Sequence, residues 1–592
     1  MSPSRISTPD RKWWKDGVVY QIYPASFKDS NGDGTGDIPG VISKLDYIKS
    51  IGIDIVWLCP MYDSPQFDMG YDIANYEDVY PPYGTLADMG TLIQGCHERG
   101  MRLILDLVIN HTSHEHAWFK ESRSSKTNPK RDWYIWRPAK YDANGNRQPP
   151  NNWRGNFGGS VWQWDEATEE YYLHLFCPEQ PDLNWENPET RQAIYDSAMK
   201  FWLDKGVDGF RIDVVNMYSK DPTFVDAPIV DNDSLWQNAA HLYCNGPRMH
   251  EFLDEMNTEV LSKYDTMTVG ELPATPDLGK VMQYISAKQK QLNMVFQFDV
   301  VDLGTGPERK YGTTPKNFTL PSLKKAIGGS QSLLNNSDAW TTVFMENHDQ
   351  ARSISRFASD KPEHRTASGK LLSLMLTALS GTLYIYQGQE IGMINIPSSW
   401  PIDEYKDVEA INHWNDVRAR FNDDPEMLAY AQRALQYLAR DNGRTPVQWD
   451  GSANGGFTTA EAKPWMRVND SYSEINVAQQ SGDKNSVLSF WKRMLALRKE
   501  YADLFVHGSY EVHDADNLST YTFVKENEEL TALVALNFSE EEQPVAVPER
   551  LQGRKLRLLA GTMEAEDGLM GRSKVLAPFE GRIYLVDNEF MN

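Results

Sequence analysis

The chain has 592 residues, of which 40% are hydrophobic and 24% are charged, so it has the composition of a globular protein with enough apolar mass for a large core. At about 150 residues per structural unit, this length predicts three or four units. The 83 acidic residues outnumber the 59 basic ones and give a net charge of −24, which argues against nucleic acid and anionic membranes as partners because both require a basic surface.

The N-terminal segment and the cysteines indicate a protein of the cytoplasm. Residues 1–16 are polar and contain no apolar stretch of the kind that a signal peptide carries, and no run of about eighteen apolar residues occurs in the chain. The four cysteines lie far apart, and Cys59 follows an apolar run typical of a core strand. We therefore expect a reduced cytoplasmic protein, with export without a leader as the alternative.

Short β-branched and aromatic runs alternate with amphipathic helical patterns along most of the chain. Such alternation predicts parallel strands joined by helical crossovers, and eight units close into an α/β fold of the (β/α)₈ TIM barrel type. The helical patterns include residues 41–50, 86–99, 190–205 and 369–380. The eight predicted strands are residues 18–23, 53–58, 102–108, 207–212, 267–271, 294–298, 342–345 and 383–387.

Two segments depart from this alternation. Residues 112–184 are rich in Trp, Asn, Gly and Pro, which predicts an irregular lobe (domain B) inserted after the third strand. From residue 510 the pattern has a period of two, which predicts a C-terminal antiparallel β domain, sandwich-like, with strands at 520–524, 531–538, 555–559 and 582–586. We therefore divide the chain into a first barrel segment (1–111), domain B (112–184), a second barrel segment (185–509) and the β domain (510–592).

Polar side chains cluster where the predicted barrel strands end. Asp106 ends the third strand, Arg211 and Asp213 end the fourth, Glu271 ends the fifth, and a His-Asp pair at 348–349 follows the seventh. Catalytic groups converge on the C-terminal rim of such a barrel, and a carboxylate at the end of an apolar strand is costly unless it is paired or functional. One such residue is as often a structural cap as a functional group, but several at neighbouring rim positions predict an active site.

Two of these carboxylates have the arrangement that glycoside hydrolysis needs. Arg211 and Asp213 are two residues apart on a strand, so their side chains face the same side. A guanidinium beside a carboxylate favours the ionised form, which a nucleophile requires. The alternative interpretation is that Arg211 and Asp213 form an ion pair at the rim with a purely structural role. Glu271 favours the catalytic one because it supplies the second carboxylate of an acid and nucleophile pair.

Several motifs extend this interpretation to a known family. Asp-Leu-Val-Ile-Asn-His (106–111), Gly-Phe-Arg-Ile-Asp-Val (209–214), Val-Gly-Glu-Leu (269–272) and Glu-Asn-His-Asp-Gln (346–350) resemble the four signature regions of glycoside hydrolase family 13, the α-amylase family. Pro-Asp-Leu-Asn-Trp (181–185) resembles its fifth region. Gln-Phe-Asp-Met-Gly-Tyr-Asp (66–72) and Ala-Arg-Asp-Asn-Gly-Arg-Thr-Pro (439–446) resemble the oligo-1,6-glucosidase and maltase branch.

The resemblance implies a retaining, exo-acting α-glucosidase. Its substrates would be small oligosaccharides of the isomaltose, maltose or sucrose type, with transglucosylation as a side activity and no organic cofactor. Asp213 is implied as the nucleophile that forms the glucosyl-enzyme, and Glu271 as the acid/base. Asp349 is implied to hold ring hydroxyls in the oxocarbenium-like transition state, and Asp106 to position its neighbours.

The remaining side chains of the implied glucose site come from separate parts of the chain. Asp68 and Arg440 are implied as the pair that closes the site behind the non-reducing end. Taken alone, a histidine or an aromatic residue is more often structural, so the other assignments depend on the resemblance. It implies that Tyr71 stacks on the glucose ring, that His111 and His348 bind its hydroxyls, that Phe157 and Phe176 wall the site, and that Arg211, Val214 and Arg352 complete it.

A loop after the first strand has the pattern of a cation site. Asp29, Asn31 and Asp33 place oxygens at alternate positions with a glycine next, as in a calcium loop. The twelfth position is Gly40, so the glutamate of an EF-hand is missing. The family resemblance implies a structural Ca²⁺ ion with the Thr35 carbonyl and Asp37 as further ligands; a plain Asn/Gly turn is the alternative.

Two rival functions share elements of this pattern. A transglucosidase or a sucrose isomerase of the same family would keep every catalytic residue. Isomerases carry an Arg-Leu-Asp-Arg stretch after the sixth strand, whereas residues 298–306 read Phe-Asp-Val-Val-Asp-Leu-Gly-Thr-Gly, which counts against isomerisation but not against transfer. Non-enzymatic relatives such as the heavy chains of amino-acid transporters have a membrane helix and usually lack some of the catalytic set, so we place that alternative last.

Two positions beside the catalytic carboxylates point to different linkages. Relatives with valine after the nucleophile, as at Val214, tend to accept α-1,6 bonds, and those with threonine prefer α-1,4 bonds. Glu271 is followed by Leu272 and Pro273, where isomaltases carry Met-Gln, and proline lacks the side-chain donor that glutamine offers to the second sugar. We expect α-1,6 bonds to be accepted, with α-1,4 specificity as the alternative.

Overall fold

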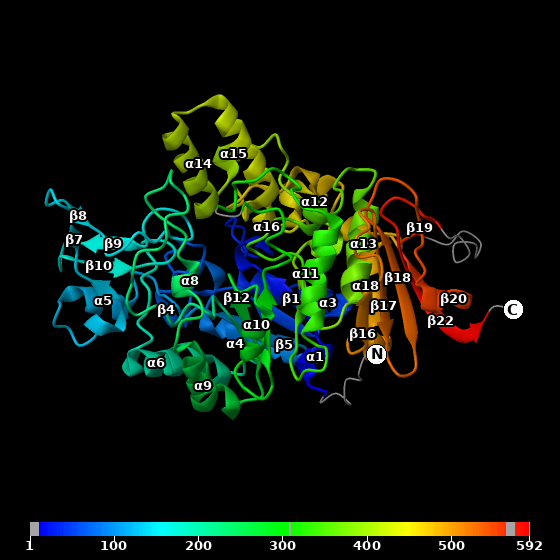
Figure 1. Ribbon diagram of the computed structural model, residues 1–592, viewed down its shortest axis with the longest axis horizontal. Coiled ribbons are helices and arrows are strands. Elements are labelled where there is room, and N and C mark those ends of the chain that lie inside the picture. Colours follow the sequence, from blue (N-terminus) through cyan, green and yellow to red (C-terminus); the bar gives the residue numbers. More distant parts are fainter. Residues whose placement is uncertain (1–10, 307–308, 564–574, 591–592) are drawn as a thin grey trace.

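The structure is a computed structural model that describes residues 11–306, 309–563 and 575–590. The barrel occupies the middle of the molecule, domain B projects at one end, and the C-terminal sheet lies at the other end (Figure 1). Two predicted segments lie partly outside the described residues: residues 1–10 of the polar N-terminal segment, and residues 564–574 and 591–592 of the β domain.

The predicted (β/α)₈ barrel is confirmed. Every neighbouring pair of strands is parallel, in the order β13-β12-β11-β5-β2-β1-β15-β14. The end strands β13 and β14 contact each other, and Thr342 Oγ1 donates to the Val295 carbonyl at 3.0 Å, so the sheet curls into a nearly closed barrel. The strands are β1 (Val18–Ile22), β2 (Ile55–Leu58), β5 (Arg102–Leu107), β11 (Gly209–Ile212), β12 (Met267–Leu272), β13 (Met294–Gln297), β14 (Thr342–Val343) and β15 (Thr382–Tyr386).

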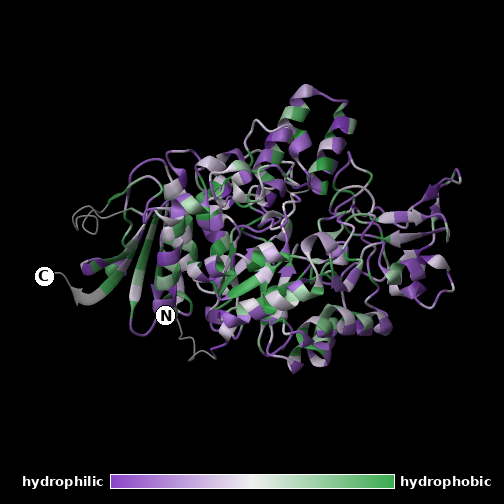
Figure 2. Cartoon of the chain, turned by 180° about the vertical axis from the view of Figure 1, so that it is seen from behind, coloured by the Kyte–Doolittle hydropathy of each residue, from purple (hydrophilic) through white to green (hydrophobic). Residues whose placement is uncertain are grey.

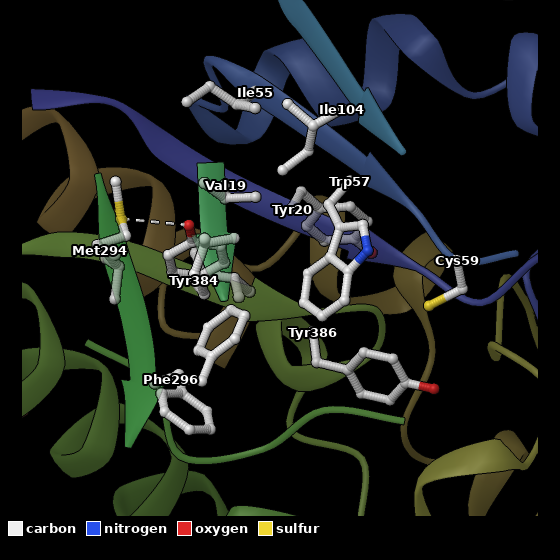
Figure 3. Packing of buried hydrophobic residues seen from close by; sticks show 14 of the residues in the cluster. Val19, Tyr20, Ile55, Trp57, Cys59, Ile104, Met294, Phe296, Tyr384 and Tyr386 are labelled. Atoms are coloured by element: carbon white, nitrogen blue, oxygen red, sulfur yellow. Dashed lines mark hydrogen bonds between the residues drawn. The ribbon is translucent and has the colours of Figure 1, made fainter. Parts of the chain in front are cut away.

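Large side chains fill the interior of the barrel. The Trp57 and Phe296 rings stack at 5.6 Å, and Tyr384 meets Phe296 edge-on at 4.7 Å (Figure 3). The Tyr384 hydroxyl donates to Met294 Sδ at 3.4 Å. Because this core is packed, the side chains at the strand ends rest on a rigid base.

The helices around the barrel follow the predicted patterns, with two local differences. The segment 86–99 forms α4 (Leu86–Glu98), which begins at a capping box, and 369–380 lies mostly in α13 (Arg365–Thr377). The segment 41–50 is split into α2 (Ile38–Ile42) and α3 (Leu45–Ile51). The segment 190–205 is helical as far as Asp204, but a π-helical stretch, Tyr195–Lys200, separates α6 (Pro188–Ile194) from α7 (Phe201–Asp204).

Domain B has a hydrophobic core of its own. It contains α5 (Ala117–Ser124) and an antiparallel sheet of β6 (Trp136–Arg137), β10 (Glu170–Leu173) and β9 (Trp162–Asp165). The buried cluster includes Trp153, Trp162, Leu173 and Val214. Since Val214 lies two residues after the end of β11 and directly after Asp213, the lobe packs against the rim of the barrel next to the predicted nucleophile.

The C-terminal segment forms a five-stranded antiparallel sheet, with a separate two-stranded sheet beside it. The four predicted strands are present, and the short edge strand β16 was not predicted because Ser509–Val512 contains only two apolar positions. The sheet packs on α13 and also contacts α11 (Leu320–Ser332) and α19 (Ala502–Phe505). The strands are β16 (Ser509–Val512), β17 (Thr520–Glu526), β18 (Thr531–Asn537), β22 (Gly581–Phe590) and β20 (Arg554–Gly561), and the small sheet is β19 (Gln543–Pro544) with β21 (Val575–Leu576).

A helical hairpin after the eighth barrel strand was not predicted from the sequence. It consists of α14 (Val408–Phe421) and α15 (Pro425–Leu438) and rises from the barrel in Figure 1. Hydrophilic and hydrophobic residues alternate along its two helices, whereas the barrel strands are mainly hydrophobic (Figure 2). Asn412 Nδ2 donates to the Phe157 carbonyl at 3.1 Å, so the hairpin reaches domain B across the rim.

Two general features concern the cysteines and the membrane. The four cysteines are buried free thiols. Among the residues that the structure describes, no helix combines the length and the apolar character that crossing a bilayer requires.

Candidate active site

Arg211 holds three carboxylates together at the rim. Its Nη1 donates to Asp106 Oδ1 at 2.6 Å and to Asp213 Oδ1 at 2.8 Å, and its Nη2 lies 2.9 Å from Glu271 Oε2. These residues come from the C-terminal ends of the adjacent strands β5, β11 and β12. A planar guanidinium with donors in a fixed fork can fix the positions of several carboxylates at once. The sequence predicted that these groups lie close together, and the structure brings them into direct contact through one side chain.

The electrostatics of this cluster differ from the simple expectation for Arg211. We expected the guanidinium to favour an ionised Asp213, but its charge is shared among three carboxylates. Burial raises the pKa of Asp213 well above its usual value, Arg211 opposes this, and the nearby carboxylates of Glu271 and Asp106 raise it further. Glycoside hydrolysis requires two neighbouring carboxyl groups, one that acts as an acid and one that acts as a carboxylate, and the cluster supplies two such groups in Asp213 and Glu271.

The backbone of Val214 contributes to the placement of Glu271. Its N–H donates to Glu271 Oε2 at 3.2 Å, so Glu271 has two donors, the other being Arg211. Val214 has a φ of +34°, which is strained for a β-branched residue. Its side chain is buried in the apolar cluster of domain B. The packing of that lobe therefore holds a strained backbone that orients a predicted catalytic group.

Asp349 lies on the side of the site formed by the 439–446 motif. Its Oδ1 accepts from Arg440 Nη1 at 3.1 Å and from Arg444 Nη2 at 3.0 Å, and its Oδ2 lies 3.1 Å from His348 Nε2. Burial alone would raise the pKa of Asp349, but His348 and the two arginines hold this pKa well below its usual range. The Asp349 side chain is 24% exposed, compared with 9% for Asp213 and for Glu271, so it is the most accessible of the three predicted catalytic carboxylates.

A chain of buried hydrogen bonds joins His348 to the carboxylate cluster. Gln21 Nε2 lies 2.8 Å from His348 Nδ1, and the Tyr71 hydroxyl lies 2.6 Å from His348 Nε2 and 3.2 Å from Asp106 Oδ2. With the Gln21 amide as donor, Nδ1 accepts and Nε2 carries the proton. Burial lowers the pKa of His348 to about 3, so the ring is neutral. The Tyr71 and His348 rings stack at 5.2 Å.

The predicted pair Asp68 and Arg440 is present. Asp68 Oδ1 accepts from Arg440 Nη2 at 3.1 Å, and Asp68 Oδ2 accepts from Gln180 Nε2 at 3.1 Å. Burial raises the pKa of Asp68, and Arg440 and Arg444 oppose this. Gln180 Nε2 also lies 3.2 Å from His111 Nε2. Gln180 therefore joins two predicted glucose-binding residues that are distant in the sequence.

The predicted aromatic wall forms a continuous row. The Arg440 guanidinium lies 4.7 Å from the centre of the Phe157 ring, Phe157 lies 5.6 Å from Phe176, and Phe176 lies 5.1 Å from His111. Burial lowers the pKa of His111 to about 4, so this imidazole is neutral. Phe157 and Phe176 come from domain B, so the lobe supplies the middle of a row that runs from Arg440 to His111.

The structure does not bring Arg352 into this cluster. Its guanidinium is fully buried and donates to the carbonyls of Gln387 at 2.7 Å and Gly443 at 3.3 Å. It also pairs with the buried carboxylate of Glu346 at 3.4 Å. Arg352 therefore ties together chain segments behind the rim, and its donors do not point to the predicted glucose site.

Four residues of the cluster were missed in the sequence. Arg444 lies within the quoted motif 439–446 and Gln180 directly precedes the motif at 181–185, so proximity to a motif was the available signal. Gln21 is a polar residue inside an apolar strand run, which also could have been noticed. Asp407, which pairs with both Arg440 and Arg444 at 2.8 Å, had no signal beyond its place before a helix.

The loop predicted to bind calcium is closed by its own hydrogen bonds. Both oxygens of Asp29 accept from backbone amides, with distances of 2.7 Å to Gly32 N and 2.8 Å to Gly34 N. Within the described residues of the chain, no group of three or more His, Cys, Asp or Glu side chains is arranged to hold a metal. The five oxygens are nevertheless of the type that Ca²⁺ prefers, and calcium stays a prediction. Asn31, Asp33, Thr35 and Asp37 lie in the same network, and Asp37 also caps α2.

Comparisons with known proteins agree with the geometry. The family model described as "Alpha amylase, catalytic domain" matches residues 21–508. An α-glucosidase of Candida albicans is 54% identical over 98% of this chain and 100% of its own length, and an oligo-1,6-glucosidase of Saccharomyces cerevisiae is 49% identical over 97% and 98%. Among solved structures, an isomaltulose synthase from Erwinia rhapontici is 38% identical and covers 98% of this chain and 100% of its own, with a TM-score of 0.91. A trehalose-6-phosphate hydrolase from Bacillus licheniformis is 40% identical over the same shares, with a TM-score of 0.89.

Proposed function

The chain belongs to the α-amylase family, glycoside hydrolase family 13, and from this premise we propose that it is a retaining, exo-acting α-glucosidase that releases glucose from the non-reducing end of short α-glucosides. One observation carries the proposal. A single guanidinium, that of Arg211, binds both Asp213 and Glu271, so the two carboxyl groups lie on either side of a common anchor. We expect them to be about 5–5.5 Å apart, the separation of retaining enzymes.

In this mechanism the two carboxyl groups act in two steps. A carboxylate oxygen of Asp213 attacks the anomeric carbon while Glu271 gives its proton to the departing glycosidic oxygen. The first step leaves a glucosyl ester on Asp213 and a carboxylate on Glu271. Glu271 then removes a proton from a water molecule, whose oxygen attacks the anomeric carbon and releases Asp213. Two inversions at one carbon give α-glucose, which is net retention.

The neighbouring residues support binding of a terminal glucose. Asp349 is ionised and the most accessible of the three carboxylates, which suits hydrogen bonds to ring hydroxyls. The ion pair of Asp68 and Arg440 joins loops that are far apart in the chain, which supports a site closed behind the non-reducing end. A site closed in this way admits one terminal sugar, and the enzyme would act from chain ends.

For the linkage, we propose that α-1,6 bonds are accepted. The side chain of Val214 presents only methyl groups, and it packs in the apolar cluster of domain B. Similarity alone does not favour one linkage, because an α-glucosidase and an oligo-1,6-glucosidase of Saccharomyces cerevisiae are 50% and 49% identical to this chain. An apolar wall discriminates between substrates by about 1–3 kcal/mol, so we expect a preference for α-1,6 bonds and not an absolute specificity.

Transfer of glucose to an acceptor sugar is the second candidate activity. The solved structures similar to this chain include an isomaltulose synthase and a trehalulose synthase, at 38% and 40% identity. Residues 298–306 contain no arginine, which counts against isomerisation. We therefore propose hydrolysis as the main reaction, with transfer at high sugar concentration.

Two further proposals concern the setting of the enzyme. The loop at residues 29–37 offers oxygen ligands, which supports a structural calcium ion. This loop is distant in sequence from the catalytic carboxylates. The four buried free thiols support a reducing compartment, in line with the predicted cytoplasmic location.

The decisive experiment measures glucose release from maltose, isomaltose and sucrose, with the anomer of the first product followed by NMR. We expect α-glucose as the first product from each good substrate. Release of β-glucose would contradict the retaining mechanism, and no release from any of the three sugars would contradict the proposed function.

A further inference from the structure

Asp407 is a buried carboxylate that serves two regions of the molecule at once. Its Oδ2 accepts from Arg440 Nε at 2.9 Å and from Arg444 Nη1 at 2.8 Å. Its Oδ1 accepts from the backbone N–H groups of Glu409 at 3.0 Å and Ala410 at 3.4 Å, which caps the N-terminus of α14. One oxygen therefore binds the arginines of the predicted glucose site, and the other binds the first turn of the hairpin.

The backbone of Asp407 is fixed to the same motif. The N–H groups of Lys406 and Asp407 both donate to Asp441 Oδ1, at 2.6 and 3.0 Å. Asp441 begins the short helix α16 (Asp441–Arg444), and Arg440 and Arg444 lie at the two ends of this segment. The start of the hairpin and the arginine motif thus form one hydrogen-bonded unit.

The two arginines pass this constraint on to the glucose side of the site. Both donate to Asp349 Oδ1, and Arg440 also pairs with Asp68. Asp349, Asp68 and Asp407 therefore share two guanidinium groups, and Glu409 Oε2 lies farther away, 3.9 Å from Arg440 Nε. Asp407 is only 2% exposed and lies behind the arginines. Asp407 supplies part of the negative charge that balances the two arginines. Asp349 and Asp68 therefore do not have to balance them alone.

The hairpin carries the constraint outward to other segments of the rim. On α14, Asn412 donates to the Phe157 carbonyl of domain B, and Asp416 pairs with Arg309 at 3.0 Å. Glu409 pairs with Lys310 at 2.8 Å. Arg309 and Lys310 belong to the segment after β13, so α14, which Asp407 caps, connects that segment and domain B to the arginine motif.

We propose that Asp407 is a positioning residue for glucose binding: through Arg440 and Arg444 it sets the orientation of Asp349 and Asp68, and it locks the hairpin to them. This inference rests on the proposed function, because it assumes that these side chains hold the terminal glucose. It requires the carboxylate charge of Asp407 and not merely its capping oxygen.

Asp407→Asn separates the two roles. Asparagine has nearly the same shape and is an equally good N-cap, but its neutral amide cannot balance two guanidinium groups. The arginines would then turn to Asp349 and Asp68, which would move away from the sugar hydroxyls. Since a misplacement of about 1 Å can cost about 100-fold in rate, we expect kcat/KM to fall by about 100-fold.

Asp424→Asn is the matched control. Asp424 caps α15 of the same hairpin, accepting from the N–H groups of Glu426 at 2.9 Å and Met427 at 3.1 Å, and it makes no ion pair within the described residues. The same substitution there changes a cap without touching the arginines, so kcat/KM should stay within twofold of the parent. Asp407→Glu restores the charge with a longer side chain and should recover some of the loss.

The experiment measures kcat and KM of the full-length parent and the three variants on maltose, isomaltose and an aryl α-glucoside, together with inhibition by glucose and the melting temperature. We expect Asp407→Asn to lose the same factor on all three substrates, since they share only the glucose, and to raise the inhibition constant of glucose. A loss that depends on the leaving group, a change equal to that of Asp424→Asn, or a variant that no longer unfolds cooperatively would each overturn the proposal. An inactive parent would instead contradict the proposed function.

Discussion

The shared role of Arg211 leads to a quantitative prediction for Arg211→Lys. The guanidinium makes three charge-assisted contacts, at 2.6, 2.8 and 2.9 Å, to Asp106, Asp213 and Glu271. A lysine ammonium is a single point charge, so it cannot contact Asp106, Asp213 and Glu271 at the same time. We therefore expect at least one of the three contacts to be lost in the variant.

The size of the effect follows from the value of one such contact. A hydrogen bond to a charged group is worth about 1.5–3 kcal/mol, which corresponds to about a 10- to 150-fold decrease in kcat/KM. The pH dependence has a definite sign. Arg211 opposes the burial that raises the pKa of Asp213. Weakening that opposition raises the pKa of Asp213 further, so ionisation of the nucleophile needs a higher pH and the acid limb of kcat/KM moves upward.

The assay is the pH profile of kcat/KM on an aryl α-glucoside for the parent and Arg211→Lys. Arg102→Lys is a suitable control, because Arg102 lies at the opposite end of β5 and pairs with Asp208 at 2.6 Å. The control should leave the acid limb unchanged. An acid limb that stays in place or moves to lower pH in Arg211→Lys would refute the reasoning.

Three further predictions test other features of the site. Asp213→Ala should abolish turnover while the melting temperature stays close to that of the parent, and near-normal activity would show that Asp213 is not the nucleophile. If the loop around Asp29 binds calcium, chelation should lower the melting temperature, since a ligand at 100 times its Kd stabilises the native state by about 2.7 kcal/mol; no shift with a chelator, together with no metal by elemental analysis, would remove calcium. Val214→Thr should move the ratio of kcat/KM values from isomaltose toward maltose, and an unchanged ratio would exclude Val214 as the determinant of linkage.

The barrel and the position of the catalytic rim could be predicted from the sequence because both depend on local patterns. An apolar run of about five residues followed by a helical period specifies a buried parallel strand and its crossover. Once eight such units close, the residues that end the strands must meet at one edge. Asp106, Asp213 and Glu271 were located in this way, and the family motifs extended the set to Asp68 and Arg440.

The partners of these residues were decided only by the tertiary structure. Arg440 and Asp68 are 372 positions apart in the chain, and no local pattern specifies which carboxylate an arginine meets across such a separation. For the same reason Arg352, adjacent to a motif, could be assigned to the glucose site although its donors bind backbone carbonyls behind the rim.

Electrostatic balance and backbone strain likewise exist only in the folded chain. The sequence places Arg211 two residues from Asp213, which suggests a simple ion pair, but folding adds Asp106 and Glu271 to the same guanidinium and buries all four groups. The positive φ of Val214 occurs where its side chain is buried in the apolar cluster of domain B. Sequence patterns thus determined which elements form and where their ends meet, whereas the charges, contacts and strain at that meeting point depend on side chains that only the tertiary fold brings together.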